Sequence, residues 1–219
     1  EIGVRLVGSE MCIRDRLMKH GVLTPFVFWS RIQYYTFSTF TLFFIWLGAT
    51  LFKADIPFLY TADCRYIVAA GLVTLSVMYH IIVRPGAIRT HRLNDISYEH
   101  FSFYNYIFHY FIPVLMTADY LFFVDKTELH WHIMISWMIY PALYVVFVYW
   151  RAWMTIVTHG TSHLYPYTFM DPRMNDVFSI TKGCLKVGFQ FFLIGICVYA
   201  AGKGLYLLDI PPAAWTYNG

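Results

Sequence analysis

The chain has 219 residues, of which 58% are hydrophobic and only 13% are charged, and its formal net charge is +3. Soluble domains contain about 25% charged residues, so this chain has too few charges to form a hydrated shell around a core of its size. A small net charge without a basic stripe excludes nucleic acid as an expected partner. Aromatic residues make up 21% of the chain, which suits helices that place rings at the membrane interfaces. The composition as a whole therefore predicts an integral membrane protein surrounded by membrane lipids.

The first sixteen residues differ in origin from the rest. Residues 6–15, LVGSEMCIRD, resemble the conceptual translation of a transposase-type sequencing adaptor over ten consecutive positions. We therefore expect residues 1–16 to be non-native and assign the fold to residues 17–219, as a single transmembrane helical domain. The native N-terminus is expected to lie outside this sequence.

Five hydrophobic runs are each long enough to cross a bilayer core of about 30 Å as a helix, which takes about 20 apolar residues. In chain order they cover residues 32–52, 66–83, 101–124, 132–150 and 183–208. Charged or turn residues bound each run, and no period-two alternation indicates a β-barrel. The predicted fold class is all-α: a polytopic bundle of transmembrane helices with five spans present.

The distribution of Lys and Arg predicts which loops face the cytoplasm. One side collects eight of them, in the N-terminal segment and the loops 84–100 and 151–182, whereas the other side holds four. We expect a multi-pass protein of the plasma membrane with the richer side in the cytoplasm. The starts of the first and third spans, the end of the second span and the 151–182 loop then share one membrane face.

Polar side chains within the hydrophobic runs need a reason, because burying them in lipid is costly. His109 lies inside the third span, where a functional site and a neutral histidine hydrogen-bonded across a helix interface remain equally open. His80, near the end of its span, favours an interfacial position. Thr36 belongs to a hydroxyl cluster, YYTFSTFT, for which interhelical packing is the common role, although His109 is the best-placed base for a nucleophilic threonine. Asp119, in the other half of the third span, is expected to pair structurally or to line a cavity, rather than to join a site with His109.

The loop 164–172, LYPYTFMDP, contains two prolines, two tyrosines and an aspartate. A residue before proline disfavours helix, and tyrosines suit headgroup depth. The loop therefore predicts an interfacial cap or a lid over a cavity, with the cap favoured.

Metal and cofactor motifs are weak. His130 with His132, and His159 with His163, lack a convincing set of partners, so solvated loop histidines are favoured and no metal site is predicted. No GxSxG, HExxH, Walker A or GxGxxG motif is present, which leaves no recognisable soluble-enzyme chemistry. No cofactor is predicted, although paired His80 and His109 leave haem ligation open as an alternative.

Three segments, in order, carry a resemblance to a known family: YYTFSTFTLFF, IFHYFIPVLMTADYLFF, and WMIYPALYVVFVYWRAW followed by YPYTFMD. They resemble a bacterial family of multispanning membrane proteins named for six prolines (the Pr-six-Pr family). That family is distantly similar to the androgen-induced and androgen-dependent TFPI-regulating membrane proteins. Those are six-span hydrolases of fatty-acid esters of hydroxy fatty acids that use an intramembrane threonine and histidine.

The resemblance implies an intramembrane lipid-ester hydrolase with Thr36 as nucleophile and His109 as general base. It also implies a sixth span ahead of Thr36 in the complete protein. The expected substrate-binding residues are His80, Tyr165, Tyr167 and Asp171. The chain departs from the family where Thr39-Phe40 replaces Ser-Asn and Arg151-Ala152 replaces Arg-Gly. The alternative is a non-enzymatic membrane protein, namely a small transporter, a lipid binder or a structural component.

Overall fold

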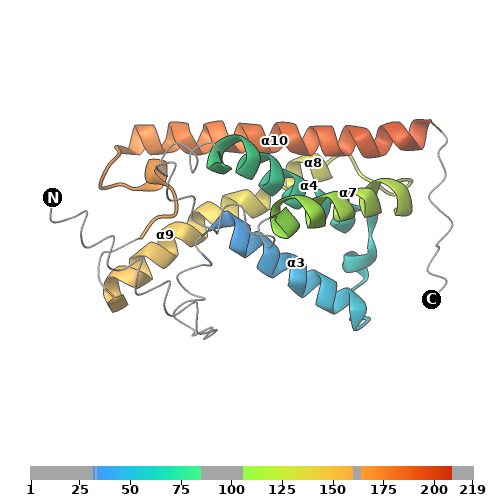
Figure 1. Cartoon of the computed structure of the whole chain (residues 1–219), viewed down its shortest axis with the longest axis horizontal. Coiled ribbons are helices and arrows are strands. Elements are labelled where there is room, and N and C mark those ends of the chain that lie inside the picture. Colours follow the sequence, from blue (N-terminus) through green and yellow to red (C-terminus); the bar gives the residue numbers. More distant parts are fainter. Residues whose placement is uncertain (1–31, 33, 85–105, 160–163, 209–219) are drawn as a thin grey trace.

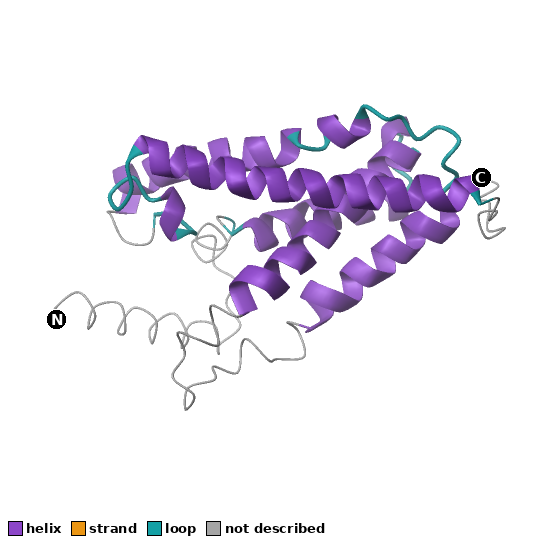
Figure 2. Ribbon diagram, turned by 90° about the horizontal axis from the view of Figure 1, so that it is seen from above, coloured by secondary structure: helices purple, strands orange, loops and turns teal. Residues whose placement is uncertain are grey.

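The fold is described by a computed structural model over residues 32, 34–84, 106–159 and 164–208. Within these ranges the regular elements are all helical and no strand occurs (Figure 2). The predicted all-α class is confirmed. Three helices are long and apolar enough to cross a membrane, namely Ala62–Ile81, Ile133–Val157 and Val177–Leu207, and two shorter apolar helices cover Tyr35–Leu51 and Ile107–Phe123.

The described elements are all helices or helical turns. In order they are α3 (Tyr35–Leu51), η1 (Pro57–Tyr60), α4 (Ala62–Met78), η2 (Tyr79–Val83), η3 (Ile107–Phe111), α7 (Ile112–Phe123), α8 (Ile133–Ser136), α9 (Ile139–His159), η4 (Thr168–Met170) and α10 (Val177–Leu207). Two of them, η2 and η3, are π-helical turns that continue into or from a neighbouring α-helix.

The two largest differences between the described helices and the predicted spans come from polar side chains that the hydropathy pattern assigns to loops. Helix α9 ends at His159 rather than residue 150, because Arg151 is buried inside it and donates Nη1–H to the Leu164 carbonyl at 3.3 Å. Helix α10 begins at Val177 rather than residue 183, because the Asp176 side chain accepts from the Ser179 N–H and caps the first turn.

Helix α4 is the central helix of the bundle and contacts α3, α7 and α10. Its middle consists of three buried small residues, Ala69, Ala70 and Gly71. A β-carbon on Gly71 would meet Thr39 Cγ2 of α3 at 3.9 Å. Small side chains allow helices to approach closely in a membrane, so this stretch sets the distance between α3 and α4.

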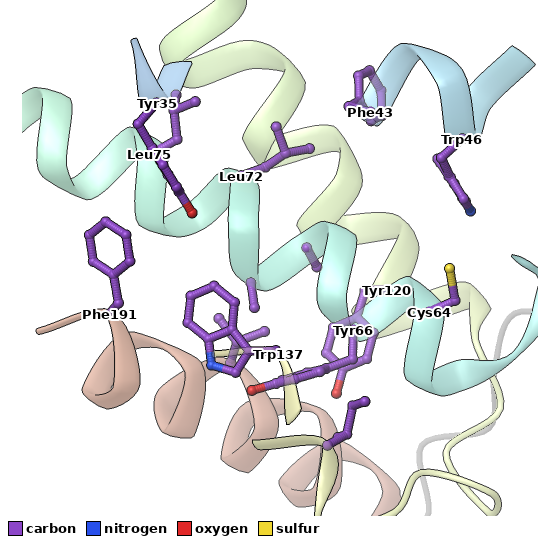
Figure 3. Close-up of a cluster of buried hydrophobic side chains, with 14 of the residues drawn as sticks. Tyr35, Phe43, Trp46, Cys64, Tyr66, Leu72, Leu75, Tyr120, Trp137 and Phe191 are labelled. Atoms are coloured by element: carbon purple, nitrogen blue, oxygen red, sulfur yellow. The ribbon is translucent and has the colours of Figure 1, made fainter. Parts of the chain in front are cut away.

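Helix α10 runs along one side of the bundle (Figure 1). Its packed edge alternates glycine with an apolar residue at spacings of three and four, a heptad pattern, through Gly188, Phe191, Gly195, Val198 and Gly202. Figure 3 shows Trp137, Tyr66 and Tyr120 gathered between α4 and α10. Trp137 lies over Gly195 and Tyr120 lies over Gly202, each in the space that a β-carbon would fill.

The outward surface is strongly apolar. In the most apolar window of α10 only 17% of the residues are buried, and Leu185, Phe189 and Leu193 are among its exposed side chains. Soluble monomers rarely expose apolar patches larger than a few hundred Å², whereas lipid covers such a surface without cost. A helix of 31 residues is about 46 Å long, against a hydrocarbon core of about 30 Å. The bundle is therefore compatible with a membrane protein.

Candidate functional site

The candidate site is built on the two π-helical turns, each of which carries a histidine of the predicted site. His80 lies in η2 and His109 lies in η3. In η2 the Arg84 N–H bonds to the Tyr79 carbonyl, and in η3 the Ile112 N–H bonds to the Ile107 carbonyl, five residues back in both cases. Such π-bulges are rare and frequently occur at functional sites.

Pro113 supplies a local physical reason for the π-helical turn at His109. Proline has no N–H to donate to the carbonyl four residues earlier, and its ring clashes with that carbonyl, which here belongs to His109. The helix relieves this conflict by widening over Ile107–Phe111 before α7 continues. The backbone around His109 is therefore less regular than that of an ordinary helix turn.

The two π-helical turns contact each other through aromatic pairs. The His109 imidazole stacks on the Tyr79 ring with centroids 3.9 Å apart and planes at 29°. The His80 Nδ1 lies 3.0 Å from the Tyr110 hydroxyl. Tyr79 is buried, His109 is half-buried and His80 is exposed. The two histidines thus lie in one interlocked aromatic cluster, each against a tyrosine of the opposite turn.

Thr36 lies on α3, on the helix face that contacts this cluster. Phe40, one turn after Thr36 on the same face, packs against Phe108 with ring centroids 4.9 Å apart. Phe108 directly precedes His109 in η3. Thr36 itself is half-buried, and its hydroxyl makes no hydrogen bond among the residues that the structure describes. The α3 face and the π-helical turn meet, therefore, without a hydrogen bond between Thr36 and His109.

The neighbouring hydroxyls of α3 join that helix to α9. Thr39 Oγ1 lies 2.7 Å from the Tyr140 hydroxyl, and Ser38 Oγ lies 3.3 Å from the same atom. Thr39 is buried. These groups fulfil the interhelical hydrogen bonding expected of the hydroxyl cluster. The sequence does not indicate that Tyr140 is the hydrogen-bond partner, because 101 residues separate it from Thr39.

The loop before α10 lies packed on α9 and near the start of α3. Tyr165 packs on Tyr149 with centroids 5.5 Å apart, and the Tyr149 hydroxyl donates to the Met170 carbonyl at 2.8 Å. Burial raises the pKa of Tyr167 to about 12, against the opposing effect of hydrogen bonds from the Tyr35 backbone and the Tyr144 side chain. Tyr167 is thereby placed beside Tyr35, the residue before Thr36. These contacts hold the loop against α9 and the start of α3.

Asp171 takes part in a local ion pair. Its carboxylate accepts from Arg173 Nη2 at 2.7 Å and from Arg173 Nε at 2.9 Å. The hydrogen bond from Arg173 lowers the pKa of Asp171 below its usual value. Of the predicted substrate-binding residues, Tyr167 is therefore the one with a contact to α3, His80 belongs to the π-helical turns, and Asp171 is occupied in its own turn.

A second group of polar residues lies at the opposite end of α4. Arg65 pairs with Asp119 of α7 and stacks over the Trp46 ring, 5.2 Å from its centroid. The expectation that Asp119 pairs structurally is confirmed. Next to this pair, Asp63, His130 and His132 bring ligand atoms close enough to hold a metal ion.

Comparison with known proteins gives no relative. No family model matches the chain, and neither a curated protein nor a solved structure matches it. The class of protein is thus defined by the structure: an all-α bundle with three helices long and apolar enough to cross a membrane. One end of this bundle carries a histidine on each of two contacting π-helical turns.

Proposed function

We propose that the protein is a multi-pass protein of the plasma membrane that hydrolyses lipid esters at the bilayer. The observation that supports this proposal best is the contact between Phe40 and Phe108, which joins the Thr36 face of α3 to the turn of His109. A histidine is the commonest general base, and hydrogen bonds at a catalytic site are often long before substrate binds. The two side chains therefore come from elements that touch, at a turn type frequent in functional sites.

The proposed reaction has two steps. In the first, the Thr36 Oγ1 attacks the ester carbonyl, its proton passes to His109, and the departing alkoxide takes that proton as the carbon–oxygen bond breaks. In the second, water attacks the threonyl ester, gives a proton to His109, and releases the fatty acid while the threonine oxygen regains the proton. Atoms and charges balance without a cofactor.

The substrate class follows from the surface around the site. The helices expose large apolar side chains such as Phe44 of α3, Phe111 of η3 and Val114 of α7, so an acyl chain would approach laterally through lipid. His80 and Tyr110 supply hydrogen-bonding groups at the exposed edge of the cluster. Tyr165 and Tyr167 in the capping loop would then bound the other side. This arrangement suits a lipid with a polar ester group and long acyl chains.

A second candidate is a non-enzymatic membrane protein, and one observation favours it. Among the described residues the Thr36 hydroxyl has no hydrogen-bond partner, whereas Ser38 and Thr39 bond across to Tyr140 as ordinary packing groups. In this alternative the π-helical turns and their histidines serve a transporter, a lipid binder or a structural component.

The two candidates are separated by labelling with a fluorophosphonate probe in detergent or membranes. The hydrolase predicts labelling of the wild type that Thr36→Ala and His109→Ala both abolish, with expression and thermal unfolding intact. Thr41→Ala is the matched control, because Thr41 is a hydroxyl on the same helix that donates to the Phe37 carbonyl at 2.8 Å, and it should keep full labelling. A well-folded wild type that does not label, or labelling that survives Thr36→Ala, favours the non-enzymatic alternative.

A further inference from the structure

Three potential metal ligands from distant parts of the sequence meet at the end of α4 opposite the π-helical turns. Asp63 lies in the first turn of α4, and His130 and His132 lie just before α8. One ligand atom from each residue lies within 4.8 Å of the other two. The sequence alone favours solvated loop histidines, because no motif links them to Asp63, which lies 67 residues from His130.

The geometry is held by the backbone as well as by the side chains. Asp63 Oδ1 accepts the His130 N–H at 3.1 Å, and Asp63 Oδ2 lies 3.0 Å from His130 Nδ1. The imidazole rings of His130 and His132 lie 5.1 Å apart at 33°. On either side of the two histidines, Leu129 and Ile133 are buried, so the segment between them is anchored to the core.

The buried Lys126 holds the loop that contains the two histidines in place. Lys126 donates Nζ–H to the carbonyls of Leu121 and Val124 at 2.8 and 2.5 Å. Its own carbonyl accepts from Lys203 Nζ of α10 at 2.8 Å. The loop that presents the histidines is therefore tied to both α7 and α10. A ligand site needs this kind of support, because ligands held by rigid neighbours lose little freedom on binding.

We propose that Asp63, His130 and His132 bind a divalent transition-metal ion such as Zn²⁺. Two imidazoles and a carboxylate suit zinc and its neighbours, whereas Ca²⁺ and Mg²⁺ prefer all-oxygen sites. With metal–ligand bonds of about 2.1 Å, two ligand atoms of a tetrahedral ion lie about 3.4 Å apart. The Asp63–His130 pair is already near that separation, at 3.0 Å.

Closing the site around an ion takes small side-chain movements. His130 and His132 are exposed, so their rings can turn toward Asp63 through solvent, and water would complete the coordination. The ion would then link the start of α4 to the segment that leads into α8. This site is at the far end of α4 from Thr36 and His109, and the proposal does not depend on the proposed hydrolase.

Metal binding is tested on the purified full chain in detergent, without an affinity tag and after chelator treatment. Titration with Zn²⁺ by calorimetry should show one equivalent bound, and Co²⁺ should give the visible absorption of a tetrahedral or five-coordinate site. Asp63→Asn and His132→Ala should each weaken Zn²⁺ binding at least tenfold. Glu128→Gln is the matched control, because Glu128 is an exposed carboxylate in the same loop, and it should bind as the wild type does.

Three results would overturn the proposal. The first is no stoichiometric binding by a folded wild type. The second is equal binding by wild type and His132→Ala, which would assign the metal to other histidines. The third is weak binding to all variants alike, as expected of scattered surface imidazoles. Circular dichroism and gel filtration of each variant exclude loss of the fold as the cause of lost binding.

Discussion

The indole of Trp137 lies over Gly195 of α10, so close that a β-carbon on this glycine would overlap Nε1 of the ring. Tyr120 of α7 occupies the equivalent space over Gly202, one heptad further along α10. Between them the Tyr66 hydroxyl donates to the Gly195 carbonyl at 3.0 Å. Three large rings thus reach the backbone of α10 because two of its residues have no side chain, and this fixes how α10 docks on α4 and α7.

Gly195→Ala should therefore destabilise the bundle. The added methyl group cannot be accommodated without moving Trp137, which is fully buried, and overpacking a core costs about 1–3 kcal/mol. Thermal unfolding in detergent should show a lower Tm than the wild type. Gly204→Ala is the control, since nothing lies within 4 Å of a β-carbon there. It should be neutral or stabilising by up to about 1 kcal/mol through helix propensity. Equal Tm values for the two variants would contradict the close packing at Trp137.

Thr36→Val and Thr39→Val should separate a functional hydroxyl from a structural one. Thr39→Val removes the 2.7 Å hydrogen bond to Tyr140 from a buried position, and the free energy of unfolding should fall by about 1 kcal/mol. Thr36→Val breaks no hydrogen bond among the described residues, so unfolding should be unchanged while probe labelling is lost. Denaturant titration and labelling on the same samples measure both effects. The reverse pattern would move the nucleophile to Thr39.

The ion pair between Arg65 and Asp119 should contribute measurably to stability. Both side chains are partly buried, at 24% and 31% exposed, so water screens the pair less than at a free surface. Arg65→Met and Asp119→Asn should each lower the free energy of unfolding by about 2 kcal/mol, because each leaves the other charge uncompensated. A double-mutant cycle should give a coupling free energy of about 1–2 kcal/mol. Additive effects would show that the pair contributes nothing beyond its separate members.

The turn that contains Asp171 should weaken in acid. The hydrogen bond from Arg173 lowers the pKa of Asp171 in the folded state, so its stabilising effect is complete above the ordinary carboxyl pKa of about 4. The effect is lost as the pH falls through the lower pKa of the folded state. The difference in Tm between wild type and Asp171→Asn should thus be largest near neutral pH and shrink below about pH 4.

A matched carboxylate controls for the general effect of acid on the charged surface. Asp55 is exposed between α3 and η1 and takes part in no ion pair among the described residues. Asp55→Asn therefore serves as the reference for removing an exposed carboxylate that has no ion-pair partner among the described residues. If Asp171→Asn behaves like Asp55→Asn across the whole range, the ion pair with Arg173 does not persist in solution.

The all-α fold class could be predicted from the sequence, because long runs without charged residues predict helices that cross a membrane. Hydropathy misplaced the ends of α9 and α10, since it counts Arg151 as a boundary although this arginine is buried, and cannot recognise Asp176 as a helix cap. The expectation that Asp119 is paired needed only the cost of a charge in a span. The identity of its partner, Arg65, could not be predicted, because it depends on how α4 packs against α7.

The candidate site shows the same division. Thr36 and His109 stand out as polar groups in apolar runs, but the stacking of His109 on Tyr79 and the contact between Phe40 and Phe108 depend on how α3, η2 and η3 dock. The π-helical turn at His109 had a local signal in Pro113, whose missing N–H frees the His109 carbonyl. No local sequence signal indicates that Asp63 meets His130 and His132, because 67 residues separate Asp63 from His130.

A π-helical turn changes the register of everything on one side of it. Each residue corresponds to about 100° of rotation around a helix axis, so deleting one residue between Phe108 and Ile112 would rotate Phe108 by that angle relative to α7. Phe108 would leave Phe40, while Asp119 would keep its place against Arg65. The number of residues in this turn thus sets the direction in which His109 faces relative to α7. Gaining or losing one residue would reorient the end that carries His109, whereas the end that carries Asp119 would stay as it is.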